Sequence, residues 1–159
     1  MSDIEKPPPL ASREFIHPQG AVAPGYLANH AARVFNRLVD MRLRTHDLSL
    51  ALIRPLLVLS WKGPLLQRDL VRFSAVKQPA MVALLDKLET AGMIERTVTS
   101  TDRRAATIRL TGRGEHAAEI GRAMLMEVNT EAVSGLSVGE TAAVVDLLTR
   151  LIQNLERHP

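Results

Sequence analysis

The chain has 159 residues, enough for one domain or for one compact lobe with an appendage. Hydrophobic residues make up 46% of it but aromatic residues only 3%, so aliphatic side chains must build the core, which favours packed helices over a β-sandwich. The lack of cysteine excludes a disulfide framework, a thiolate metal site and a thiol redox switch. No apolar run approaches the roughly 18–20 residues of a membrane span, and the N-terminus lacks the layout of a signal peptide, so we expect a cytoplasmic protein.

Positive charge is concentrated in the middle third of the sequence. The formal net charge is +3, but residues 61–113 hold ten Lys and Arg against five Asp and Glu, whereas residues 114–159 hold three against seven. The middle third is therefore where a polyanion would bind. An unevenly charged solvated surface would give the same pattern, so charge alone does not decide the function.

The pattern of residues 1–61 predicts a flexible arm followed by two helices. Residues 1–24 contain five of the nine prolines and show little periodicity, which is typical of a flexible arm. Apolar residues then recur at three- and four-residue spacing over 25–45, which predicts a long amphipathic helix. Residues 50–61 are more apolar all round and predict a second, buried helix.

The middle third predicts two further helices, over 65–73 and 77–91, joined by a turn. Pro79 lies in the first turn of the second helix, where its missing N–H costs nothing, and Gly92 suits the left-handed position that ends it. The apolar stripe that should face the core consists of Met81, Leu84, Leu85 and Leu88.

After Gly92 the spacing of the apolar residues changes from the 3.6 residues of a helix to the two residues of a strand, which predicts a β-hairpin. Its strands are residues 94–98 and 106–110, on either side of a turn. Thr111 should cap a helix that runs to about residue 136, and Ser137 with Glu140 forms a capping box at the start of the last helix.

Two short helices and a following β-hairpin predict a mainly α protein of the winged helix-turn-helix class. An α-helix fits the major groove of B-DNA, where base edges can be distinguished, and a basic hairpin tip can enter the adjacent minor groove. Asp102, Arg103 and Arg104 lie at that tip, where the aspartate can orient one guanidinium.

The run LLQRDLVRFSAVKQPAMVALLDKLETAGMIER, followed by TDRRAATIRLTGRG, resembles the MarR family of transcriptional regulators, especially its SlyA branch. The Gln78-Pro79 pair carries the likeness to that branch. The resemblance implies a homodimer with a helical dimerisation region, formed by 25–47 and 112–159, and a DNA-binding domain over 48–111. The other aligned features are Leu70, Leu84, Leu88, Gly92, the Asp-Arg-Arg wing and Leu110-Thr111.

The resemblance also implies contacts to double-stranded DNA. Relatives of the SlyA type often carry a base-reading arginine at the position of Ala83 and a hydroxyl at that of Ala80. Base edges are therefore read chiefly by Gln78 and by apolar contact with thymine methyls, which favours an A/T-rich palindrome with half-sites about one helical turn apart. The expected DNA-binding residues are Lys77, Gln78, Pro79, Ala80, Ala83 and Lys87 of the helix, and Asp102, Arg103 and Arg104 of the wing.

Members of the family often bind small aromatic acids in a pocket beside the dimer helices. The residues that would form such a pocket here are Tyr26, His30, Arg33 and Trp61, because an arginine and a histidine can pair a carboxylate. Ordinary surface or interface hydrogen bonds would explain the same side chains. The five histidines are too scattered for a metal site, and no cofactor or catalytic motif is recognisable, so we expect neither a metal, a cofactor nor an enzyme.

Two functions remain for the winged helix. The first is a sequence-specific transcriptional regulator, in this family more often a repressor. The alternative is a winged-helix protein-interaction module without sequence-specific DNA binding. A steep fall in DNA affinity with rising salt separates the two, since each phosphate contact releases counterions.

Overall fold

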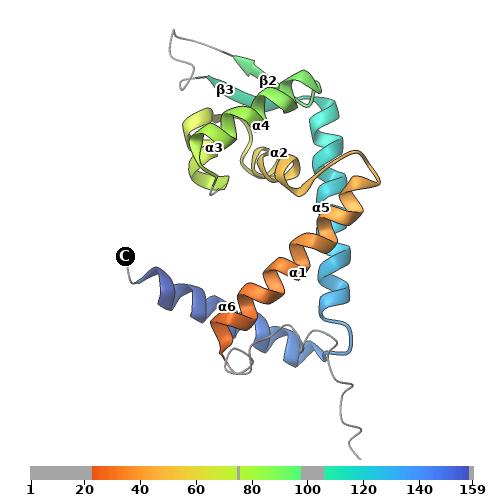
Figure 1. The fold of residues 1–159 in the computed structure, drawn as a ribbon, viewed down its shortest axis with the longest axis vertical. Coiled ribbons are helices and arrows are strands. Elements are labelled where there is room, and N and C mark those ends of the chain that lie inside the picture. The colour runs from red at the N-terminus through yellow and green to blue at the C-terminus, as the bar shows by residue number, and fades with distance from the viewer. Residues whose placement is uncertain (1–22, 75, 98–105, 158–159) are drawn as a thin grey trace, which may run out of the picture. The chain divides into compact units, whose positions relative to one another are not determined.

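The computed structural model describes residues 23–74, 76–97 and 106–157. The chain divides into two compact units, which we call the winged unit (Phe35–Ser134) and the helical unit (the described residues up to Val34 and from Gly135 on). Figure 1 labels their elements. These are α1 (Pro24–Arg44), α2 (Leu50–Lys62), β1 (Leu65–Leu66), α3 (Gln67–Ser74), α4 (Gln78–Thr90), β2 (Ile94–Thr97), β3 (Thr107–Leu110), α5 (Gly112–Ala132) and α6 (Val138–Glu156).

The winged unit contains a three-stranded antiparallel sheet in the order β1-β3-β2, and its first strand corrects the sequence prediction. Residues 65–73 were expected to be one helix. Instead Leu65 and Leu66 pair with β3, and the backbone N–H of Gln67 donates to the carbonyl of Ala106 at 3.0 Å. Two residues are too few to show a period, so a strand this short leaves no pattern in the sequence.

Helix α2 lies at the centre of the winged unit. Its N-cap Ser49 accepts a hydrogen bond from the N–H of Leu52, and Gly63 ends it at φ +78°. Ile53 and Leu56 are fully buried, which confirms the expectation of a buried helix. The helix also runs without interruption across Pro55.

Helix α5 approaches α2 through a glycine. A Cβ placed on Gly121 would lie 2.3 Å from Cγ2 of Ile53, well inside van der Waals contact. Only a residue without a side chain allows this approach, so Gly121 fixes how closely α5 packs on α2.

The start of α5 is joined to the turn that follows α4. The hydroxyl of Thr111 accepts from the N–H of Gly114 and donates to the carbonyl of Gly92 at 2.6 Å. Gly92 has φ +67°, as expected for the residue that ends α4. A Cβ on Gly114 would lie only 1.9 Å from the carbonyl oxygen of Met93, so the helix touches this turn directly.

Helix α5 ends at Ala132, a few residues earlier than expected. Gly135 follows at φ +84°, and the capping box of α6 is confirmed. The backbone N–H of Ser137 donates to Glu140 at 2.7 Å, and this bond holds the pKa of the Glu140 carboxyl below its usual value. None of the helices in the described ranges is long and apolar enough to cross a membrane.

We predict that Gly121→Val lowers the free energy of unfolding by about 1–3 kcal/mol more than Gly112→Val does. Valine is a better helix former than glycine, so helix propensity does not explain a destabilisation at either position. A Cβ on Gly112 meets nothing within 4 Å, which makes Gly112→Val the control without a steric conflict. Urea unfolding followed by circular dichroism, at one protein concentration, measures the difference. Equal destabilisation by both variants would show that α5 does not depend on this contact.

Candidate nucleic-acid interface

Helix α4 has one buried face and one exposed face. Met81, Leu85 and Leu88 are at most 1% exposed, and Leu84 is half-buried, so the predicted inward stripe is confirmed. The other face is open to solvent along the whole helix. Pro79, Ala80, Ala83 and Lys87 lie on this face. Gln78 is exposed as well, but it is the first residue of the helix and lies in line with the buried stripe of Met81, Leu85 and Leu88.

The N-terminus of α4 is suited to an anion. Lys77 is its N-cap, with an extended backbone and no side-chain capping hydrogen bond, and Pro79 follows in the first two positions. The N–H groups of the first turn are therefore not satisfied by the cap, and helix N-termini of this kind attract phosphate oxygens. The exposed ammonium of Lys77 adds a positive charge beside them.

The basic residues of the sheet and of α4 differ in whether a carboxylate pairs with them. On the sheet, the Arg109 guanidinium bonds the Glu95 carboxylate, so its charge is already compensated. On α4, neither Lys77 nor Lys87 has a carboxylate within salt-bridge distance among residues 23–74, 76–97 and 106–157. Neither lysine is therefore held in an ion pair within these residues, although Asp86 and Glu89, whose carboxylates contact Arg96, flank Lys87.

The predicted wing tip, Asp102, Arg103 and Arg104, lies outside the described residues. The structure does show the strands that lead to it, and Figure 1 shows α4 beside them. Residues Ile94–Thr97 of β2 pair in register with Thr107–Leu110 of β3.

The predicted effector residues are divided between the two units. Tyr26, His30 and Arg33 lie on α1 in the helical unit, where Tyr26 and Arg33 are exposed and His30 is half-buried. Trp61 belongs to the winged unit and is 80% exposed. The ammonium of Lys62 lies 4.3 Å from the centre of the Trp61 ring and 4.2 Å from that of Phe73. Trp61 thus already has a cationic neighbour within its own unit.

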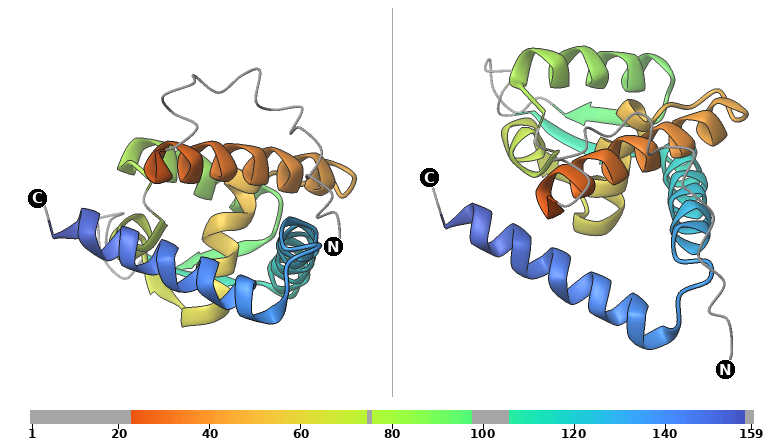
Figure 2. Two further views of the ribbon diagram at one scale, coloured as in Figure 1. Left: turned by 90° about the horizontal axis from the view of Figure 1, so that it is seen from below. Right: turned by 60° about the horizontal axis from the view of Figure 1, so that its bottom comes forward.

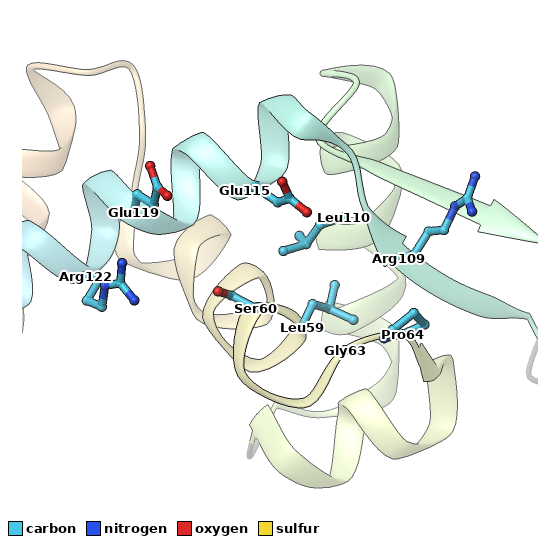
Figure 3. Close-up of a pocket in the computed structure, with 9 residues that line it drawn as sticks. All are labelled: Leu59, Ser60, Gly63, Pro64, Arg109, Leu110, Glu115, Glu119 and Arg122. Atoms are coloured by element: carbon cyan, nitrogen blue, oxygen red, sulfur yellow. The ribbon is translucent and has the colours of Figure 1, made fainter.

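A cavity of about 420 Å³ opens between the end of α2, strand β3 and the first half of α5 (Figure 3). Leu59 and Leu110 form its apolar part, and the Glu115 carboxylate points toward them. The Arg109 side chain points away, which agrees with its pairing to Glu95. This cavity could not be predicted from the sequence, because its walls come from α2, β3 and α5, which are far apart along the chain. The only signal was the helical spacing of Glu115, Glu119 and Arg122.

The helical unit has a larger, apolar groove of about 670 Å³ between α1 and α6. Helix α6 has no buried residue along its 19 positions, although it is rich in leucine and valine. Figure 2 shows the two long helices of this unit. The groove is lined by Pro24, Leu27, Ala28, Ala31, Val144, Leu147, Leu148, Arg150, Leu151, Asn154 and Leu155.

The described side chains offer no cluster of three or more His, Asp or Glu that could hold a metal ion. What these residues do offer is an exposed helix face on a rigid support, with Lys77 at the start of the helix and Lys87 near its end, beside the acidic side chains of Asp86 and Glu89.

Several known proteins resemble this chain in sequence and in fold. A model of the MarR family matches residues 46–105. The structure resembles that of the transcriptional regulator PA3341, with 30% identity over 84% of this chain and 98% of that one, and a TM-score of 0.72. It also resembles a mutant MarR from E. coli complexed with operator DNA, with 22% identity, coverage of 82% and 94%, and a TM-score of 0.71.

A third similar structure is that of BpsR from Bordetella bronchiseptica, solved to explain how 6-hydroxynicotinic acid regulates its DNA binding. It is 21% identical over 80% of this chain and 96% of that one, with a TM-score of 0.71. At this identity the likeness shows the fold alone. The fold class predicted from the sequence, mainly helical with a small winged-helix sheet, is confirmed. The family model and the near-complete coverage of PA3341 lead to one conclusion: this chain belongs to the MarR family of transcriptional regulators.

Proposed function

We propose that this protein is a dimeric, sequence-specific DNA-binding regulator that places α4 in the major groove and its arginine wing in the minor groove. The observation that carries the proposal is the division of α4 into two faces. Its buried stripe anchors the helix in the core, while two alanines and a lysine on the opposite face, and Gln78 at the exposed first turn, are open to solvent. The MarR structure solved with operator DNA supports this use of the fold.

The exposed side chains define what such a helix would read. The Gln78 amide can make paired hydrogen bonds to adenine, and the methyl groups of Ala80 and Ala83 can contact thymine methyls. Lys77 and Lys87 would contact phosphates, which position the protein without specifying a sequence. We therefore propose an A/T-rich palindromic operator, with a larger share of specificity in groove shape and in the wing. The Gln78-Pro79 pair favours the SlyA branch.

The helical unit supports the proposed dimer. The α1–α6 groove is lined almost entirely by apolar side chains, and α6 buries none of its residues within the described part of the chain. A second copy of the chain, which would bring the same groove, is its proposed occupant. Each of the two winged units in the dimer would then bind one half-site of the operator. The proposed regulator acts as a repressor by occupying promoter DNA.

We predict that Gln78→Ala, Arg103→Ala and Arg104→Ala each weaken binding by about 1–3 kcal/mol. The probe is a duplex that the wild-type protein selects from a random pool, and the readout is fluorescence anisotropy. The Gln78 variant should relax specificity at one position, because a base contact is lost. Arg113→Ala, on the first turn of α5, is the control for charge. If selection returned a G/C-rich or non-palindromic motif, or if the wing variants bound unchanged, the proposed reading of DNA would be wrong.

For the dimer, we predict that Leu148→Asp shifts the protein toward the monomer in analytical ultracentrifugation, since a buried charge at an interface is strongly unfavourable. Leu148 lines the groove, whereas Gln153 does not, so Gln153→Asp is the matched control on the same helix. A monomeric wild-type protein, or a Leu148→Asp variant that stays dimeric, would count against this interface.

We further propose that a small aromatic acid modulates DNA binding through Tyr26, His30 and Arg33 of α1. BpsR, whose DNA binding is regulated by 6-hydroxynicotinic acid, supports this class of effector. We predict that millimolar salicylate weakens binding to the selected duplex and that Arg33→Met abolishes the effect, because the guanidinium would pair the carboxylate. Anisotropy with benzyl alcohol, which lacks the carboxylate, is the control. No change with salicylate would exclude this effector class.

A further inference from the structure

Strand β2 carries an arginine that reaches the recognition helix. The Nη2 atom of Arg96 lies 2.8 Å from Oδ1 of Asp86, and its Nε lies 3.4 Å from Oε2 of Glu89. The first contact is a charge-assisted hydrogen bond. The second is an ion pair whose geometry does not make a hydrogen bond. One guanidinium therefore joins the second half of α4 to the strand that leads into the wing.

The two sides of this contact differ in burial. The Arg96 side chain is only 8% exposed, whereas the side chains of Asp86 and Glu89 are 57% and 44% exposed. A buried guanidinium has few rotamers open to it and is less screened by salt than a surface charge. The contact is therefore a fixed point between two elements and not a mobile surface pair.

The neighbouring arginine on the sheet shows the contrast. Arg109 lies opposite Glu95 in the register of β2 and β3, and both side chains of this pair are more than half exposed. That pair links one strand of the wing to the other. Arg96 alone among the described arginines makes an ion pair between the sheet and α4.

We infer that Arg96 is a positioning residue for DNA recognition: it holds α4 and the wing at one fixed spacing, so that both can enter adjacent grooves together. The inference rests on the proposed function. The spacing matters because a helix and a wing that move independently must be ordered on binding, and that entropy lowers the affinity for the correct sequence.

Arg96 has a second effect on the same surface. Asp86 and Glu89 flank Lys87, a proposed phosphate contact, and their uncompensated charges would repel a nearby DNA backbone. The guanidinium offsets one of their two negative charges. A lysine at position 96 would keep the positive charge but has a single ammonium, which cannot bridge two carboxylates with the planar geometry of a guanidinium. The two effects can therefore be separated by substitution.

The test compares Arg96→Lys with Arg42→Lys in the full-length protein. Arg42 is a matched control, because it also contacts two carboxylates, those of Glu131 and Glu127, but joins α1 to α5. The probes are the duplex that the wild-type protein selects and a scrambled duplex of the same composition. Affinity for each is measured by anisotropy at one salt concentration, and folding is checked by circular dichroism.

We expect Arg96→Lys to reduce the ratio of selected to scrambled affinity by about tenfold, within the range of coupling between neighbouring groups. Arg42→Lys should leave that ratio unchanged. A smaller folded fraction would lower both affinities equally, so the ratio reports positioning. If Arg96→Lys keeps the wild-type ratio, the inference is wrong even though the regulator binds DNA. A wild-type protein that selects no duplex overturns the proposed function, and the inference with it.

Discussion

The close approach of α5 to α2 is the contact on which the rest of the winged unit depends. Gly121 lets α5 pack against Ile53, and Gly114 lets its first turn touch the carbonyl of Met93. Thr111 completes the connection by bonding both ends of this junction. The end of α4, the start of β2 and the first turn of α5 are therefore held as one block, and a side chain at either glycine would separate them.

This block would hold α4 in place for its proposed binding to DNA. In the proposed complex with DNA, α4 offers few polar side chains for base edges, so the binding energy would depend on accurate placement of the helix and on phosphate contacts. The buried stripe of α4 packs the helix into the core, and the ion pair of Arg96 with Asp86 joins the helix to β2. Placement is therefore supplied by the core, while Lys77 and Lys87 supply charge on the outside.

The features that could be predicted from the sequence are those that depend on interactions between residues close together in the chain. The exposed face of α4, Gly92 and the capping box at Ser137 followed from spacing and residue type alone. Strand β1 was missed because two residues carry no period and pair with a distant strand. The alternating pattern around Arg96 predicted a strand, yet nothing local shows which carboxylates its side chain meets. Likewise, spacing could not show that Trp61 belongs to a different unit from His30.

Hydroxyl-radical footprinting of the full-length protein on its selected duplex tests the central claim most directly, because it reports protection of the sugar-phosphate backbone and of the minor groove at both half-sites at once. The account predicts two protected segments about one helical turn apart, related by the palindrome, each flanked by protection where a wing enters the minor groove. A single protected segment would contradict the dimer, and protection without flanking minor-groove contacts would contradict the wing. Uniform weak protection at all positions would contradict sequence-specific recognition itself.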